Sequence, residues 1–171
     1  MGKTFVFFKC LQTLPKGTNV LFLAETVVRK NTVLEDAKFF KQVYGINPLA
    51  GYNVTFALYQ SAWKFDLQYY LPNSKSSFVC MDEIHDLLTD KRILFIHNSK
   101  LDNVKLLGLT ATIDRKTKYL VQGEEVKKID LINTFCPVIY SYTINSAIED
   151  KTTRQLKFFV VKHELDTRRD R

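Results

Sequence analysis

Four ionisable side chains follow a short apolar run near the middle of the chain. The run spans residues 78–81, and directly after it come Asp82, Glu83, His85 and Asp86. One interpretation is a strand that ends at the surface, where acidic residues open a helix because a helix N-terminus attracts negative charge. The other is a ligand site, because open parallel sheets bind ligands beyond the carboxyl ends of their strands. At such a site Asp82 could hold a magnesium ion through water, and Glu83 could orient or deprotonate an attacking water.

A second stretch with chemical potential lies at the start of the sequence. Gly2, Lys3 and Thr4 match the last three residues of a phosphate-binding loop. In that loop the Lys reaches the β- and γ-phosphates, the Thr hydroxyl binds magnesium, and a helix N-terminus attracts the anion. The complete loop carries another glycine five residues earlier, a position that this sequence does not include. The tripeptide alone is therefore too short to identify a phosphate site.

A third stretch is an apolar segment, residues 106–109, that ends in Thr110 and Thr112 on either side of an alanine. The simple alternative is an ordinary strand-to-turn junction, where Thr is common. The carboxyl ends of parallel strands meet at one edge of a sheet. If the acidic pair ends such a strand, it should lie close to Lys3 and Thr4 in space.

Apolar runs alternate with amphipathic stretches along the chain, which predicts strands alternating with helices in a parallel α/β sheet. The expected strands are residues 20–24, 54–59, 78–81, 104–109, 137–142 and 157–162. A capping box formed by Thr32 and Glu35 should open one helix that stops near Gly45, and residues 60–70 should form another. Residues 93–96 fit a strand and a helix equally well.

The bulk composition limits the class of protein. The 171 residues are 46% hydrophobic and 25% charged, as in globular proteins. The net charge of +7 and a pI near 9.3 suit a polyanionic partner. Cys10, Cys80 and Cys136 are far apart and odd in number, which indicates free thiols in a reducing compartment rather than a disulfide framework or a zinc site. No apolar run approaches the ~20 residues that cross a bilayer, so no membrane partner is expected.

Taken in order, Gly-Lys-Thr, Asp-Glu-Ile-His and Leu-Thr-Ala-Thr resemble motifs I, II and III of superfamily 2 helicases and translocases, the DEAD/DEAH-like group. Residues 22–26 resemble motif Ia, and residues 58–61 resemble the strand-end segment called Ib or Ic. Residues 137–142 and 147–150 look like the end of the first motor lobe in DNA translocases of the restriction-enzyme and phage type. The resemblance covers nearly the whole chain. It implies an α/β fold, a RecA-like parallel sheet flanked by helices that forms an incomplete P-loop NTPase lobe.

The resemblance implies ATP and Mg²⁺ as cofactors and gives the residues of motifs I and II their roles. Gly2, Lys3 and Thr4 would bind ATP, with Thr4 also at the magnesium ion. Asp82 would be the magnesium-side carboxylate. Glu83 would be the base or the group that positions the attacking water, in a chemistry that depends mostly on positioning and charge neutralisation.

The remaining roles implied by the resemblance concern nucleic acid. His85, Thr110 and Thr112 would couple the nucleotide state to the nucleic acid. Thr26 and Arg29 would contact backbone phosphate, which carries affinity without reading sequence. Two simpler alternatives stay open: His85 as a capping or surface histidine, and Arg29 as part of a plain surface helix.

The implied function is that of a fragment of an ATP-dependent helicase or translocase that moves along nucleic acid, with DNA as the expected track. We expect residues 1–165 to form a first RecA-like lobe that lacks its first strand and the start of its phosphate loop. Residues 166–171 would be a tail or a linker to a second RecA-like lobe, on the same chain or on a separate subunit. Without that lobe the fragment should be inactive. We expect the protein in the cytoplasm or at the nucleoid. The alternative is a non-catalytic nucleic-acid-binding or regulatory remnant of such a motor.

Overall fold

The computed structural model describes residues 2–62, 64, 67–71, 77–87, 104–111, 118–121, 124–127, 130, 133–134, 136–141 and 143–151. The chain divides into two units, Met1–Pro137 and Val138–Arg171, and each is described by itself. In chain order, the described helices and strands of the first unit are α1 (Gly2–Gln12), β1 (Asn19–Ala24), α2 (Val27–Tyr44), β2 (Asn53–Leu58), α3 (Tyr59–Ala62), α4 (Leu67–Tyr70), β3 (Ser77–Asp82), the 3₁₀ turn η1 (Ile84–Leu87), β4 (Val104–Leu109), β5 (Lys118–Val121) and β6 (Glu124–Lys127).

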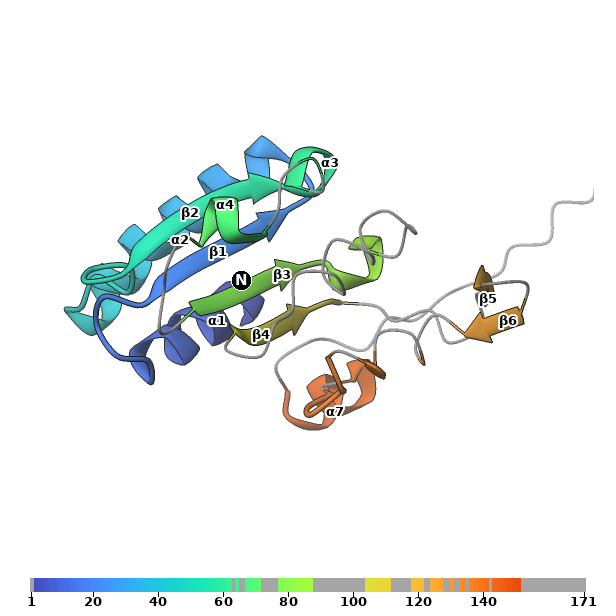
Figure 1. Ribbon diagram of the computed structural model, residues 1–171. Helices are drawn as coiled ribbons and strands as arrows, with labels where there is room; N and C mark the ends of the chain where they lie inside the picture. The colour runs from blue at the N-terminus through green and yellow to red at the C-terminus, as the bar shows by residue number, and fades with distance from the viewer. Residues whose placement is uncertain are drawn as a thin grey trace, which may run out of the picture. The chain divides into compact units, whose positions relative to one another are not determined.

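Four parallel strands form the sheet of the first unit, in the order β2-β1-β3-β4 (Figure 1). The strand β1 lies inside this sheet, where Asn19 is the register partner of both Asn53 on β2 and Ser77 on β3. All four strands point the same way, so their carboxyl ends lie at one edge. The predicted α/β fold, a parallel sheet flanked by helices, is confirmed.

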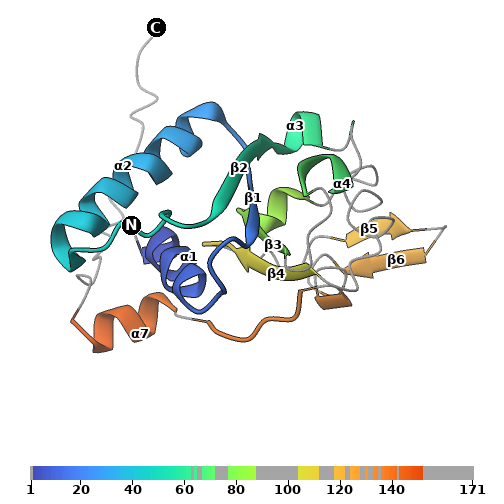
Figure 2. The ribbon, with the colours of Figure 1, turned by 60° about the vertical axis from the view of Figure 1, so that its left-hand side comes forward.

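Both faces of the sheet are covered, which explains why β1 and β3 are apolar without alternation. On β1, Phe22 packs in one core cluster with α1 and α2, whereas Leu21 and Leu23 pack in a second cluster with Tyr59. Figure 2 shows α1 and α2 on one side of the sheet and α3 and α4 on the other. Strand side chains point alternately to the two faces, so each strand supplies both clusters.

Aromatic packing fixes α1 against the sheet. The ring of Phe7 lies 5.0 Å from that of Phe22 on β1 and stacks at 6.3 Å on that of Phe78 on β3. Phe8 meets Phe40 of α2 edge-on at 5.4 Å. All five rings are buried, and each such pair adds about 0.5–1.5 kcal/mol beyond the area that it buries. The N-terminus of α1, with Lys3, is thereby held in a fixed position relative to β3.

The start of α2 differs from the prediction. The helix begins at Val27, and the hydroxyl of Thr26 accepts a hydrogen bond from the Arg29 amide at 3.3 Å, as an N-cap does. The predicted capping box at Thr32 is wrong, because Thr32 lies inside the helix and its hydroxyl donates to the Val28 carbonyl. The predicted end is correct: Gly45 closes the helix with φ 71°.

Other element predictions had mixed outcomes. The strand predicted at 104–109 matches β4, β1 and β3 extend the predicted runs by one or two residues, and β2 begins and ends one residue earlier than predicted. The helix predicted at 60–70 is described as the two short helices α3 and α4, with residues 63, 65 and 66 outside the described part. The predictions for residues 93–96 and 157–162 also fall outside the described residues. The antiparallel hairpin of β5 and β6 was not predicted.

The second unit contains α7 (Ile144–Glu149), which Thr143 caps by accepting from the Ser146 amide at 3.1 Å. The strand predicted at 137–142 is wrong for the part that is described, because residues 137–141 have no regular structure. Val138, Ile139 and Tyr140 are exposed rather than buried in a sheet. Among the described helices, none combines the length and the apolar character that a membrane span requires.

Candidate active site at the carboxyl edge of the sheet

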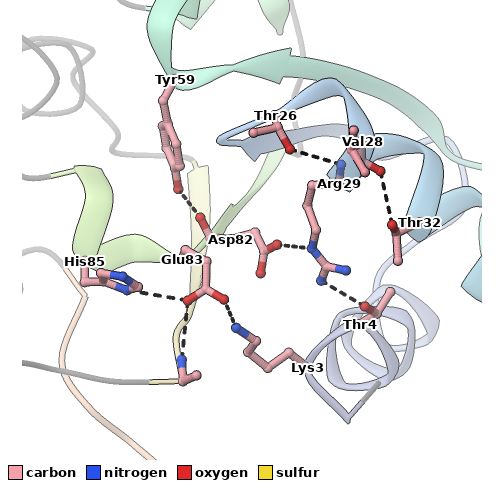
Figure 3. A network of polar contacts seen from close by, with 11 residues as sticks. Lys3, Thr4, Thr26, Val28, Arg29, Thr32, Tyr59, Asp82, Glu83 and His85 are labelled. Carbon is pink, nitrogen blue, oxygen red and sulfur yellow. Dashed lines mark hydrogen bonds and ion pairs between the residues drawn. The ribbon is translucent and has the colours of Figure 1, made fainter.

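Side chains from α1, α2 and β3 meet beyond the carboxyl edge of the sheet (Figure 3). Lys3 pairs with Glu83 through Nζ and Oε1, and the Nε of Arg29 pairs with the Oδ2 of Asp82. A second nitrogen of Arg29, Nη2, donates to the Thr4 hydroxyl at 3.0 Å. The proximity of the acidic pair to Lys3 and Thr4, expected from the parallel topology, is confirmed.

Asp82 is a buried carboxylate that depends on a positive partner. Its side chain is 1% exposed, while that of Arg29 is 25% exposed. The other carboxylate oxygen, Oδ1, is buried and has no hydrogen-bond partner among the described residues. Breaking a buried ion pair by removing one partner typically costs about 3–5 kcal/mol. Asp82 therefore needs a cation beside it. Its Oδ1 can still accept a further hydrogen bond or bind a metal ion.

Glu83 has an unusual backbone conformation. Its φ is 48°, in the left-handed region that costs a residue other than glycine about 1–2 kcal/mol. The residue before it is held in place, because the buried Tyr59 hydroxyl donates to the Asp82 carbonyl at 2.8 Å. The amide of Ala111, just beyond β4, donates to Oε2 of Glu83 at 3.4 Å. Contacts from Tyr59, Ala111 and Lys3 thus stabilise a strained turn that aims the carboxylate at Lys3.

The charge state of Glu83 follows from these contacts. Partial burial raises the pKa of Glu83, but the hydrogen bond and the charge of Lys3, together with the Ala111 amide, outweigh burial and hold the pKa below its usual value. Glu83 is therefore ionised at neutral pH and acts only as a hydrogen-bond acceptor.

His85 connects the acidic turn to the end of β4. Its Nδ1 lies 2.7 Å from the Thr110 hydroxyl and 3.4 Å from Oε2 of Glu83. The strand and the turn approach each other closely at Gly108, where an added Cβ would lie 2.5 Å from Cδ1 of Ile84. Thr110, His85 and Glu83 form one connected group, so a movement of β4 would shift the Glu83 carboxylate.

The predicted site residues are not all gathered here. Gly2 is the first residue of α1, and Thr112 lies outside the described residues. Thr26 uses its hydroxyl to cap α2, and the Arg29 guanidinium is held by Asp82 and Thr4. The predicted contacts of Thr26 and Arg29 with nucleic acid therefore stay predictions.

Two contributors were missed in the sequence. The Tyr59 hydroxyl holds the Asp82 carbonyl, and the backbone amide of Ala111 binds Glu83. Tyr59 directly follows β2 at the same edge as the acidic pair, so its position in the sequence was a usable signal. The amide of Ala111 carries no side-chain signal.

The donor set fits a hard divalent cation. A carboxylate and a hydroxyl oxygen are ligands that Mg²⁺ accepts, and it typically takes only one or two carboxylates together with water and phosphate oxygens. The unpartnered Oδ1 of Asp82 and the Thr4 hydroxyl are such oxygens. Within the described part of the chain, no cluster of three or more His, Cys, Asp and Glu side chains would hold a metal by itself.

The model of the family described as type III restriction enzyme, res subunit, matches residues 1–115 of the chain. That range includes every residue of the site above. No curated protein matches the chain.

Proposed function

The chain belongs to the family of the type III restriction enzyme res subunit, a family of superfamily 2 helicase-like N-terminal lobes, and from this premise we propose how its site works. The family implies an ATP-dependent, helicase-like motor domain. We propose that Lys3, Thr4, Asp82 and Glu83 bind and process ATP with Mg²⁺. We also propose that hydrolysis drives movement along DNA.

One observation carries the proposal. Lys3 and Thr4 on α1 meet Asp82 and Glu83 on β3, although β1, α2 and β2 lie between them in the sequence. The meeting point is the carboxyl edge of a parallel sheet, where folds of this class bind nucleotides. A helix N-terminus, a lysine and an acidic pair are the groups that phosphoryl transfer requires from this lobe.

The residues divide the chemistry between cation and anion contacts. Lys3 would exchange Glu83 for the β- and γ-phosphates, which offer more negative charge, and Thr4 and Asp82 would hold Mg²⁺. Bound Mg²⁺ supplies positive charge that offsets the charge of the phosphates. Glu83, released from Lys3 and still bound by the Ala111 amide, would orient the attacking water.

Coupling to nucleic acid would run through the group around His85. The contacts of His85 with Glu83 and Thr110 support this role, because they connect the acidic turn to the strand β4. Thr26 would face backbone phosphate, and Arg29 would do so once its guanidinium has left Asp82 and Thr4; such contacts give affinity without sequence preference. We further propose that a second RecA-like lobe, on the same chain or another subunit, completes the site. Such a lobe supplies an arginine typically worth ~10³–10⁵ in rate.

The first test is ATP binding, measured by the fluorescence of a labelled ATP analogue with MgCl₂ present. Replacing Lys3 with Met removes a charged hydrogen bond worth about 1.5–3 kcal/mol, so affinity should fall by about 10- to 150-fold. The matched control is Lys38→Met, a change on the exposed side of α2. Equal affinity for both variants would refute the assignment of Lys3.

The second test is hydrolysis with Mg²⁺ and DNA, comparing the chain with and without a supplied second lobe. DNA-stimulated turnover in the complete system should be abolished by Glu83→Gln and unchanged by Glu35→Gln, an exposed glutamate of α2. If the complete system stays silent while DNA still binds, the non-catalytic remnant becomes the better explanation. DNA affinity should fall steeply with added salt, because the basic chain contacts backbone phosphate.

A further inference from the structure

The guanidinium of Arg29 lies between the two residues that the proposed function assigns to Mg²⁺ (Figure 3). Its Nε donates to Oδ2 of Asp82, and its Nη2 donates to the Thr4 hydroxyl at 3.0 Å. A divalent ion held by Oδ1 of Asp82 and by the Thr4 hydroxyl would compete with Nη2 at that hydroxyl, and it would share the Asp82 carboxylate with the guanidinium on Oδ2. The two cations would also repel each other strongly in a site where Asp82 is almost fully buried.

The contacts of Arg29 are those of a counter-ion rather than of a surface side chain. A buried carboxylate is costly without a positive partner, and the planar guanidinium presents donors on separate nitrogens in a fixed geometry, one to Asp82 and one to Thr4. The neighbouring Lys30 is directed elsewhere, with its Nζ 5.6 Å from the centre of the Phe56 ring. Of the two adjacent basic residues on this turn of α2, only Arg29 directs its charge to Asp82.

Arg29 is also placed to leave. It stands in the first turn of α2, two residues after the helix begins, and its side chain is 25% exposed. Its long side chain can turn into solvent without moving α2, since the Thr26 cap involves only the backbone amide of Arg29. Asp82, in contrast, lies on a fully buried strand and cannot follow it.

We propose that Arg29 is a resident counter-ion of Asp82 that competes with the divalent cation for Asp82 and Thr4, so that metal binding requires the guanidinium to move out. The inference rests on the proposed function, in which these two residues bind Mg²⁺. Arg29 is then a positioning residue that sets the Mg²⁺ concentration at which the site is half occupied. The apparent metal affinity is reduced by the fraction of molecules in which Arg29 occupies the position.

The test uses MgCl₂ alone, with ionic strength held constant by NaCl, and measures thermal unfolding of the full chain. We compare the wild type, Arg29→Met and the matched control Lys30→Met. Arg29→Met should unfold at a lower temperature without Mg²⁺ and should gain more from added Mg²⁺ than the wild type. The Mg²⁺ concentration for half of the effect should fall by about tenfold or more, while Lys30→Met should respond as the wild type does.

If Arg29→Met does not fold without metal, circular dichroism during a MgCl₂ titration gives the same information. Recovery of helical signal supports the inference, and no recovery overturns it. A direct measurement is Mn²⁺ binding by electron paramagnetic resonance, in which the variant should bind Mn²⁺ about tenfold more tightly.

The outcomes separate this inference from the proposed function. If the wild type binds ATP but Arg29→Met and wild type respond equally to Mg²⁺, the competition is refuted and the proposed function stands. If no variant binds ATP but Arg29→Met still gains a stronger response to Mg²⁺, the proposed function fails and the cation site stands. Equal Mg²⁺ responses without ATP binding would refute both.

Discussion

The left-handed backbone of Glu83 leads to a stability prediction that is opposite in sign to the usual rule. In most positions Gly is less favourable than Ala, by roughly 0.5–1 kcal/mol in a helix interior. At Glu83, with φ 48°, Ala would keep the strain of the left-handed conformation and Gly would not. We therefore expect Glu83→Gly to be more stable than Glu83→Ala.

The magnitude follows from the contacts of Glu83. Both variants lose the ion pair with Lys3, in which each side chain is 30% exposed, so solvent screening limits that loss to about 0.5–1 kcal/mol. The strain is worth about 1–2 kcal/mol. The greater freedom of Gly in the unfolded chain removes about 0.4–1 kcal/mol of this gain. Glu83→Gly should thus exceed Glu83→Ala by about 1 kcal/mol and lie close to the wild type.

The assay is urea unfolding of the full chain. The dependence of the unfolding free energy on urea concentration should be the same in all variants before their free energies of unfolding are compared. The matched control is the pair Glu35→Gly and Glu35→Ala, in the middle of α2, where Ala should be the more stable by about 0.5–1 kcal/mol. The reasoning would be refuted if the Glu83 pair followed the same order as the Glu35 pair. Agreement would show that the chain retains a destabilising residue where chemistry is proposed.

Three further predictions test neighbouring contacts. Gly108→Ala should cost about 1–3 kcal/mol in thermal unfolding, because its Cβ would lie 2.5 Å from Cδ1 of Ile84, and adding Ile84→Val should recover part of the loss; purely additive losses would contradict this contact. Tyr59→Phe should cost about 1–3 kcal/mol by leaving the Asp82 carbonyl without its buried partner, and an unchanged unfolding temperature would argue against that hydrogen bond. Burial, followed by the nearby Asp82 charge, holds the pKa of the Cys80 thiol well above its usual value. Alkylation of Cys80 by iodoacetamide at pH 8 should therefore wait for unfolding, and mass spectrometry that finds it modified in the folded protein would disprove this.

The sheet was predictable because its central strands are buried on both faces. Nearly continuous apolar sequence at β1 and β3 leaves few other places for these segments, so their positions followed from the pattern alone. The meeting of Lys3 with Glu83 followed in turn from parallel topology, which brings strand ends to one edge. The site was predictable to the extent that its residues sit at the ends of such strands.

Other features depended on choices that the sequence does not express. Thr26 and Thr32 are both suitable N-caps, and the place where β1 ends decides in favour of Thr26. Arg29 has a long side chain that reaches several anions, so only the burial of Asp82 determines its partner. The apolar residues at 138–140 have the local pattern of a strand, but they are exposed. A local pattern cannot predict whether a neighbouring strand is present to pair with them.

The position of β1 inside the sheet also has a consequence for how the chain acquires its structure. Both neighbours of β1 come later in the sequence, β2 after the whole of α2 and β3 after two more helices. Contacts between segments so distant are slow to form, and parallel pairing makes them slower. During synthesis at ~5–20 residues per second, the apolar residues of β1 must wait for seconds before β3 is made. Nascent chains that stop before Ser77 should therefore aggregate or bind chaperones, whereas chains that include β3 should have their most apolar strand protected on both edges.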